Sequence, residues 1–182
     1  IKNYFTSSHL EILTTVAHLL SAKINQVNTV NSLQDTVRQL NSAQKLESSL
    51  LQIANLTYKA QNLDTFFKSL HVIIDSLLNA SNFFIALYDK KEDVLDFVYT
   101  VEGGVQTNTH KIISKDQLKE TASYYLLINE RPLLLNKEQY RHYIEQGHFK
   151  LVGELADSWL GVPYKVNERM SGVIVVQSYD KQ

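Results

Sequence analysis

The sequence predicts an α+β protein: an antiparallel sheet of about five to six strands with helices packed on it, preceded by a long N-terminal helix. Three observations lead to this prediction. The first 60 residues contain neither Gly nor Pro and repeat apolar residues every three or four positions. Strand-like apolar runs then occur in two groups, separated by a long helical stretch. Hairpins at both ends with a long connection between them favour an antiparallel sheet with helices packed on it.

The N-terminal helix is expected to run from Ser8 to Tyr58, with Ser8 as its cap and Glu11 completing a capping box. At 1.5 Å per residue it would be roughly 75 Å long. Two or three shorter helices, with breaks near Asn28 and Asn41, are the alternative. The apolar stripes lie on an otherwise polar helix at near-heptad spacing, so a second copy of the same helix is the natural partner. The residues expected at this dimer contact are Leu13, Leu20, Ile24, Val27, Val30, Leu33, Val37 and Leu40.

The remaining elements follow from changes in the apolar pattern. A further helix is expected to begin at Asn62 and to present Phe66, Phe67 and Leu70 on its apolar side. Strands are expected over 83–88, 94–101, 107–113, 133–135, 159–166 and 172–179, and helices over 115–129 and 137–146. The carboxylates of the turn after the first strand, Asp89, Glu92 and Asp93, are expected to be solvated rather than catalytic.

Three stretches carry a family resemblance. They are NFFIALYD at 82–89, NERPLLL at 129–135, and SWLGVP at 158–163 followed by GVIVVQSYD at 172–180. Together they resemble the GAF domain family, in particular GAF domains upstream of histidine kinase or GGDEF/EAL modules in bacterial signalling proteins. Each Gly and Pro also has a structural reason: Gly161 allows close approach of backbone or ligand, Pro163 suits a strand edge or bulge, and Gly172 follows a turn.

A fourth stretch, 4–25, is similar to the closing helix of a GAF domain, although here it precedes the domain. We therefore expect a linker helix over 1–45, taken from a preceding GAF domain, and a GAF domain over 46–182. Because the chain begins with Ile1 rather than Met, we expect it to belong to a larger cytoplasmic protein. The resemblance implies an effector domain in the same parent chain: a histidine kinase, a diguanylate cyclase or a phosphodiesterase.

The resemblance also implies a small-molecule site between the sheet and the insert over 104–157. That insert is rich in Tyr and His, and an aromatic pocket with a few polar groups suits a ligand. The candidate ligand-binding residues are Tyr99, His110, Tyr124, Tyr125, Tyr143, His148 and Trp159. Alternatively these side chains only pack the insert onto the sheet, which would make the protein a ligand-free structural dimerisation domain.

Composition excludes several classes of function. A net charge of −1 gives no reason to expect nucleic acid, and no apolar run approaches the roughly 20 residues of a membrane span. The absence of cysteine excludes covalent bilin attachment and a thiolate zinc site, and it disfavours an enzyme of the methionine-sulfoxide-reductase type.

No cofactor is identified from the residues. The signature of cyclic-nucleotide-binding GAF domains is missing, and His142 and His148 lack a third metal ligand. Haem ligation by one of the six histidines stays open. With neither a Gly-x-Ser-x-Gly elbow nor a Walker loop, and with no catalytic residue assigned, the prediction is a non-catalytic sensor.

Overall fold

A computed structural model describes residues 4–107 and 110–179 of the chain. The chain divides into two compact units, Ile1–Leu50 and Leu51–Gln182. The first unit consists mainly of helix α1, which runs over Ser7–Lys59 as one uninterrupted helix of 53 residues and ends in the second unit. The expected long helix is confirmed, and the alternative of shorter helices with breaks at Asn28 and Asn41 is wrong. The expected domain boundary after residue 45 stays a prediction.

The start of α1 differs from the prediction. Ser8 lies inside the first turn of the helix, so it is not the cap. Instead the Thr6 carbonyl accepts hydrogen bonds from the amides of His9 and Leu10, at 3.0 and 3.3 Å. The Thr6 amide donates to His9 Nδ1 at 3.1 Å. The bonds to the carbonyl are the first backbone bonds of the helix, and His9 takes the Thr6 amide as the third helical residue does in a capping box.

The second unit is built on one seven-stranded antiparallel sheet, which confirms the predicted α+β class. Its strands are β1 (Asn82–Asp89), β2 (Val94–Glu102), β3 (Val105–Gln106), β4 (Lys111–Ile113), β5 (Leu133–Asn136), β6 (Ser158–Lys165) and β7 (Met170–Ser178). The order across the sheet is β3-β2-β1-β7-β6-β5, and β4 also pairs with β2. The central strand β1 carries the apolar run that the sequence suggested was buried on both faces.

Helix α2 (Leu63–Leu78) covers one face of this sheet, which we call the α2 face. The Asn62 side chain caps the helix by accepting from the Thr65 amide at 2.8 Å, as expected. Phe67, Leu70 and Ile73 are buried residues of this helix, and the first two belong to a cluster with Phe83 of β1. The periodic apolar side of α2 therefore meets the strand residues that point toward it.

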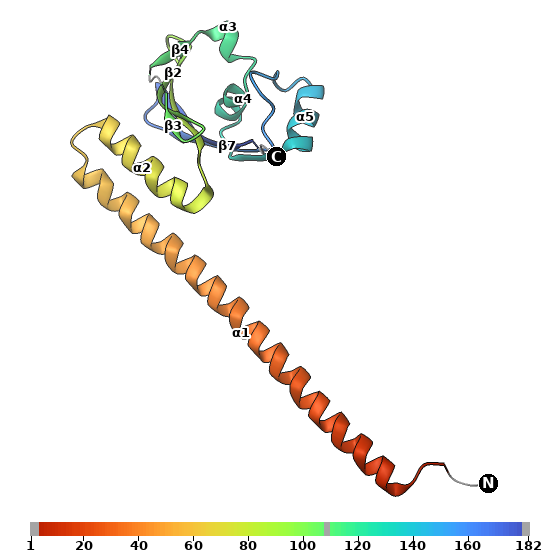
Figure 1. Ribbon diagram of the computed structural model, residues 1–182. Helices are drawn as coiled ribbons and strands as arrows, with labels where there is room; N and C mark the ends of the chain where they lie inside the picture. The colour runs from red at the N-terminus through yellow and green to blue at the C-terminus, as the bar shows by residue number, and fades with distance from the viewer. Residues whose placement is uncertain (1–3, 108–109, 180–182) are drawn as a thin grey trace. The chain divides into compact units, whose positions relative to one another are not determined.

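The opposite face, which we call the insert face, carries α3 (Lys115–Leu118), α4 (Ala122–Asn129) and α5 (Lys137–Glu145). Figure 1 shows α2 and α4 on opposite sides of the sheet. The single helix expected over 115–129 is wrong. The Thr121 hydroxyl donates to the Leu118 carbonyl and accepts from the Tyr124 amide, so it ends one helix and caps the next. A Thr at this position competes with the helix backbone for hydrogen bonds.

The single strand expected over 107–113 is also wrong. Gly103 and Gly104 both have positive φ and reverse the chain directly after β2, so that β3 forms before residue 107. His110 has a φ of 67°, and its amide donates to the Phe97 carbonyl at 2.6 Å immediately before β4. Residues 108 and 109 of the expected strand lie outside the described residues. The division into β3 and β4 gives seven strands where about five to six were expected.

The Gly and Pro residues of β6 and β7 have structural roles. The Trp159 ring lies over Gly161, where a side chain would overlap it, and the Tyr164 ring covers Gly172 in the same way. In the described part of the chain, β5 pairs with 158–161 of β6 and not beyond, so Pro163 sits on an edge where its missing N–H breaks no ladder. The close approach predicted at Gly161 is therefore made by a side chain of the same strand.

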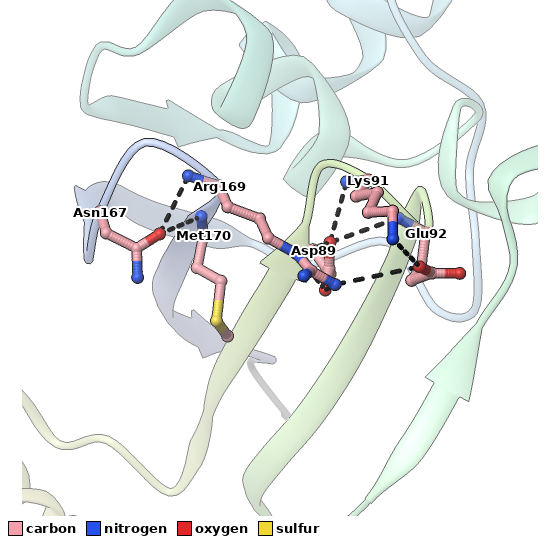
Figure 2. A network of polar contacts seen from close by, with 6 residues as sticks. All are labelled: Asp89, Lys91, Glu92, Asn167, Arg169 and Met170. Atoms are coloured by element: carbon pink, nitrogen blue, oxygen red, sulfur yellow. Dashed lines mark hydrogen bonds and ion pairs between the residues drawn. The ribbon is translucent and has the colours of Figure 1, made fainter.

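At one end of the sheet, a polar network joins the β1–β2 turn to the β6–β7 turn (Figure 2). The Arg169 guanidinium donates to both carboxylate oxygens of Asp89, at 2.8 to 3.2 Å. The pKa of Asp89 is lowered to about 2, mainly by these hydrogen bonds from Arg169. The Asn167 side chain accepts from the amides of Arg169 and Met170 and shapes the second turn. Asp89 is therefore paired rather than simply solvated.

Among residues 4–107 and 110–179, no helix combines the length and the apolar content needed to cross a membrane. The last residue of the GVIVVQSYD stretch, Asp180, lies outside the described residues.

Candidate ligand-binding groove

A groove of about 1550 Å³ lies at the end of the sheet where β1 begins and β7 ends. Its floor on the insert face includes Phe84 of β1, Phe97 of β2, Trp159 of β6 and Gln177 of β7. The rings of Phe84 and Phe97 lie 5.1 Å apart. The volume exceeds the roughly 300–1,000 Å³ of typical small-molecule pockets, so one small ligand would fill only part of it.

A β-bulge decides which β2 residues reach this floor. Ala86 pairs with Phe97 and Ile85 pairs with Tyr99, so Val98 is an extra residue in β2. Side chains alternate between faces in a regular strand, and one extra residue reverses the alternation beyond it. Phe97 and Thr100 therefore both line the groove, although they are three residues apart.

The wall of the groove is formed by the first turn of α4, by Tyr140 of α5 and by the loop over 150–154. Ser123 and Tyr140 are each only 7% exposed. Neither side chain has a hydrogen-bond partner within the described residues. Both residues line the groove, so their hydroxyls still reach solvent. Burial raises the pKa of Tyr140 to about 12, and the nearby Tyr179 makes a smaller contribution in the same direction. The Tyr140 hydroxyl is therefore protonated at neutral pH.

Charged side chains of both signs also line the groove. His110, Lys111 and Lys150 contribute basic groups, and Glu102 and Glu154 contribute carboxylates. Burial raises the pKa of Tyr179, and the charges of both carboxylates add to it, which places Glu102 and Glu154 near that phenol. The groove thus combines an aromatic floor, unpaired hydroxyls and charges.

Of the seven predicted ligand-binding residues, the structure places two in this groove. Trp159 is 2% exposed and contacts Tyr140, with ring centroids 6.4 Å apart. His110 is an exposed residue, and its Nδ1 lies 3.2 Å from Asp96 Oδ2. The groove residues that sequence reasoning missed are Phe84, Phe97, Thr100, Ser123, Tyr140 and Gln177. The alternation of Val173, Val175 and Gln177 in β7 is a signal for one of them, since it marks a polar side chain on an otherwise buried face.

Three other predicted residues form a separate aromatic cluster. The Tyr125 ring lies 5.7 Å from Tyr143 and 5.2 Å from His148, and Phe149 packs against both tyrosines. None of these residues lines the groove. The cluster packs the insert onto the core of the insert face, which corresponds to the alternative that the sequence left open for these side chains.

Tyr124 and Tyr99 lie elsewhere. Tyr124 makes an edge contact with Tyr88 at 6.5 Å and does not line the groove. Tyr99 is 3% exposed and lies on the α2 face, where its hydroxyl is 3.4 Å from His71 Nδ1. Regular alternation would have put Tyr99 on the same face as Phe97, so the bulge at Val98 is the reason that it does not share a site with Trp159.

The two histidines that the sequence showed without a third metal ligand, His142 and His148, are linked through one amide. Gln146 contacts His142 Nε2 at 2.8 Å through its Nε2, and it contacts His148 Nε2 at 3.0 Å through its Oε1. Across residues 4–107 and 110–179, no group of three or more potential metal ligands is present.

No family model and no curated protein matches this sequence significantly. Solved structures do match its fold. The GAF domain of a phosphoenolpyruvate-protein phosphotransferase (ptsP) from Coxiella burnetii has a TM-score of 0.54 at 20% identity, over 78% of this chain and 82% of that chain. The GAF domain of the phosphoenolpyruvate-protein phosphotransferase from Acinetobacter has a TM-score of 0.56 at 19% identity, over 76% and 79%. Free methionine-R-sulfoxide reductase from Neisseria meningitidis, in complex with its substrate, has a TM-score of 0.55 at 14% identity, over 78% and 80%.

The element order and the sheet define an α+β domain with helices on both faces and a helical insert over one of them. The structural matches give that arrangement its name, the GAF fold.

Proposed function

We propose that this chain is a non-catalytic sensory or regulatory domain of a larger signalling protein, that it binds a small molecule in the groove, and that it dimerises through α1. The observation that carries the ligand proposal is the pair of buried, unpaired hydroxyls on Ser123 and Tyr140 in an aromatic groove. Both hydroxyls reach the groove and have no partner within the described residues. They are therefore free to hydrogen-bond to a ligand and to orient it on the aromatic floor.

Native mass spectrometry of the protein purified from cells tests the ligand proposal. We expect a small molecule to co-purify and to be lost from the Phe97→Ala variant, whose ring lines the groove. Tyr125→Ala is the matched control, because it also removes a half-buried ring but one that does not line the groove. Loss of the molecule from both variants alike, or an apo mass under all conditions, would favour the ligand-free structural domain.

The dimer proposal rests on the exposed apolar stripe of α1. All eight residues expected at the contact are exposed, from 44% at Val27 to 66% at Leu13 and Leu40. Fully burying one Val or Leu side chain is worth about 1.5–3 kcal/mol, so a stripe of this length provides a strong driving force for self-association. The steps Val27 to Val30 and Val30 to Leu33 are both three residues, where a heptad alternates three and four. Two successive steps of three residues amount to an insertion of three residues into the heptad repeat. An insertion of this kind overwinds a coiled coil locally, and we propose that the helix pair can change register there.

Light scattering on the chain with and without residues 1–45 tests the dimer. A Leu20→Ser, Leu33→Ser variant of the full chain should also lower the mass toward that of a monomer. The same number of changes on neighbouring polar positions, Ser21→Asn and Ser32→Asn, should not. Equal monomeric masses for all these proteins would remove the dimer proposal.

The output of the parent protein is also part of the proposal. The resemblance of the SWLGVP and GVIVVQSYD stretches supports an effector of the histidine kinase or GGDEF/EAL type in the same chain. The sequence beyond Gln182 tests this directly. A reductase activity of the methionine-sulfoxide type is the weaker alternative: a structural match has that activity, but its chemistry needs the thiolates that this chain lacks.

A further inference from the structure

The first turn of α4 presents unpaired donors to the groove. Thr121 caps this helix of eight residues, and its hydroxyl takes the Tyr124 amide at 3.1 Å. The amides of Ala122 and Ser123, the two residues before Tyr124, have no hydrogen-bond partner within the described residues, and both residues line the groove. Unpaired amides at a helix N-terminus, together with the helix dipole, favour a negative charge in front of them.

Two hydroxyls on the same groove add to these amides. Ser123 and Tyr140 are more than nine-tenths buried and have no partner within the described residues. The high pKa of Tyr140 keeps its hydroxyl protonated, so it can donate to an anion. The hydroxyls point to a ligand independently of the helix terminus, because α5, a different element, supplies Tyr140.

We infer that the ligand of this groove carries an anionic group, a carboxylate or a phosphate, on an aromatic or apolar body. The anion would accept from the amides of Ala122 and Ser123 and from the hydroxyls of Ser123 and Tyr140. The apolar body would lie on the floor formed by Phe84 and Phe97. This inference rests on the proposed ligand-binding function and adds the class of ligand to it.

The fixed charges are compatible with this polarity. Lys150 lies beside the start of α4, since its amide donates to the Glu120 carbonyl and its ammonium pairs with the Glu120 carboxylate at 2.5 Å. That pair leaves little net charge near the helix start, so the amides and hydroxyls would supply most of the attraction. The negative charges of Glu102 and Glu154 lie near Tyr179, and they would repel an anion in that part of the groove.

Amide NMR titration of the full chain with three probes tests the inference. Phenyl phosphate and benzoate carry an anion on an aromatic ring, and benzyl alcohol is a neutral comparator of similar size. Because the readout is resolved by residue, binding of the probes to the exposed stripe of α1 does not obscure it. We expect saturable shifts of the Ala122 and Ser123 amides, with about tenfold tighter binding of at least one anion than of benzyl alcohol, since hydrogen bonds to charged groups are the stronger class. The two anions separate phosphate from carboxylate recognition.

Two variants locate the anion. Ser123→Asp should remove the preference for the anions, because its carboxylate competes for the same donors. The helix dipole favours this Asp and the burial of Ser123 opposes it, so the amide spectrum of the variant first checks that the fold is intact. Gln117→Glu adds the same charge on the exposed surface of α3, outside the groove, and should leave the preference unchanged. Tyr140→Phe removes only the hydroxyl and should weaken binding of the anions more than binding of benzyl alcohol.

The outcomes separate this inference from the function on which it rests. If all three probes shift Phe84 and Phe97 equally and the anions show no preference at Ala122 and Ser123, the anion inference is overturned and the groove remains a ligand site. The same conclusion follows if Ser123→Asp and Gln117→Glu behave alike. If no probe at 20 mM shifts any groove residue, both the inference and the proposed ligand-binding function are overturned.

Discussion

Gly161→Ala tests whether the floor of the groove is as tightly packed as the structure indicates. In open space this substitution would stabilise the protein. Burying one extra methyl group is worth about 0.8 kcal/mol, and replacing Gly restricts the unfolded chain by a further 0.4–1 kcal/mol, roughly. Gly161 lies in β6 without a positive φ, so backbone strain does not oppose the change.

The structure predicts the opposite sign. A side chain at Gly161 would overlap the outer ring atoms of Trp159 and approach Leu126 Cδ2 to 3.2 Å. Trp159 is 2% exposed and held against Tyr140, so its ring has little room to move away. Overpacking a core costs about 1–3 kcal/mol. This range already includes the burial of the added methyl group, and the restriction of the unfolded chain offsets roughly 0.4–1 kcal/mol of it. We therefore expect Gly161→Ala to lower the free energy of unfolding by up to about 2.5 kcal/mol.

Urea unfolding of four proteins, followed by tyrosine fluorescence, measures this effect and its origin. They are the natural chain, Gly161→Ala, Trp159→Phe and the double variant. Phe lacks the outer ring atoms that the added methyl group would meet, so Gly161→Ala should cost less in the Trp159→Phe background. We expect a coupling free energy of about 1 kcal/mol or more, in the range seen for residues in contact. A Gly161→Ala protein at least as stable as the natural chain would refute the packing argument, and so would a coupling near zero.

Three further predictions concern the frame around the groove. Asn62→Ala removes the cap of α2 and should lower the free energy of unfolding by about 1 kcal/mol in urea unfolding, whereas Asn62→Gly should cost only a few tenths; equal losses would contradict the capping role. Arg169→Gln should raise the pKa of Asp89 from about 2 toward its ordinary 3.8, measured by carboxyl NMR shifts; because folding depresses this pKa, the contribution of Asp89 to stability is present above pH 3.8 and is lost as the pH falls toward 2. Burial raises the pKa of Tyr164 from 10 to about 12, so its contribution to stability is present below pH 10 and is lost as the pH rises toward 12; the fall in the urea midpoint over that range should be shallower in Tyr164→Phe, and an identical fall in both proteins would contradict the assignment.

The sequence could predict the elements because most of them have local causes. The Asn62 cap, the apolar side of α2 and the alternating strands all act within a few residues, and they appear as expected. The errors occur where a polar residue redirects the chain. Thr121 divides the helix over 115–129, and Gly103 with Gly104 makes β3 out of residues that looked like a connection. Both are short-range hydrogen-bond or backbone effects that apolar periodicity does not detect.

The site was harder to predict because it depends on which face each strand residue occupies. One extra residue in β2, Val98, turns Tyr99 away from the insert and brings Thr100 toward it. No composition or spacing rule locates a bulge of this kind in a single sequence. Of the aromatic and imidazole side chains predicted from the insert, Tyr125, Tyr143 and His148 pack against one another outside the groove. Their part in binding a ligand stays a prediction.

The position of the groove follows from a gradient along the insert face. Closer to the Asp89–Arg169 end, Ala86 and Val173 are paired on this face, apolar and buried, and the core there includes Leu126 of α4. Toward the other end, Thr100 and Gln177 take the equivalent positions. Covering these polar groups with an apolar helix would leave them unpaired, at a cost of about 1–3 kcal/mol each. The groove lies where these polar residues are left uncovered, beside the first turn of α4, and this is the place at which we propose that a ligand binds.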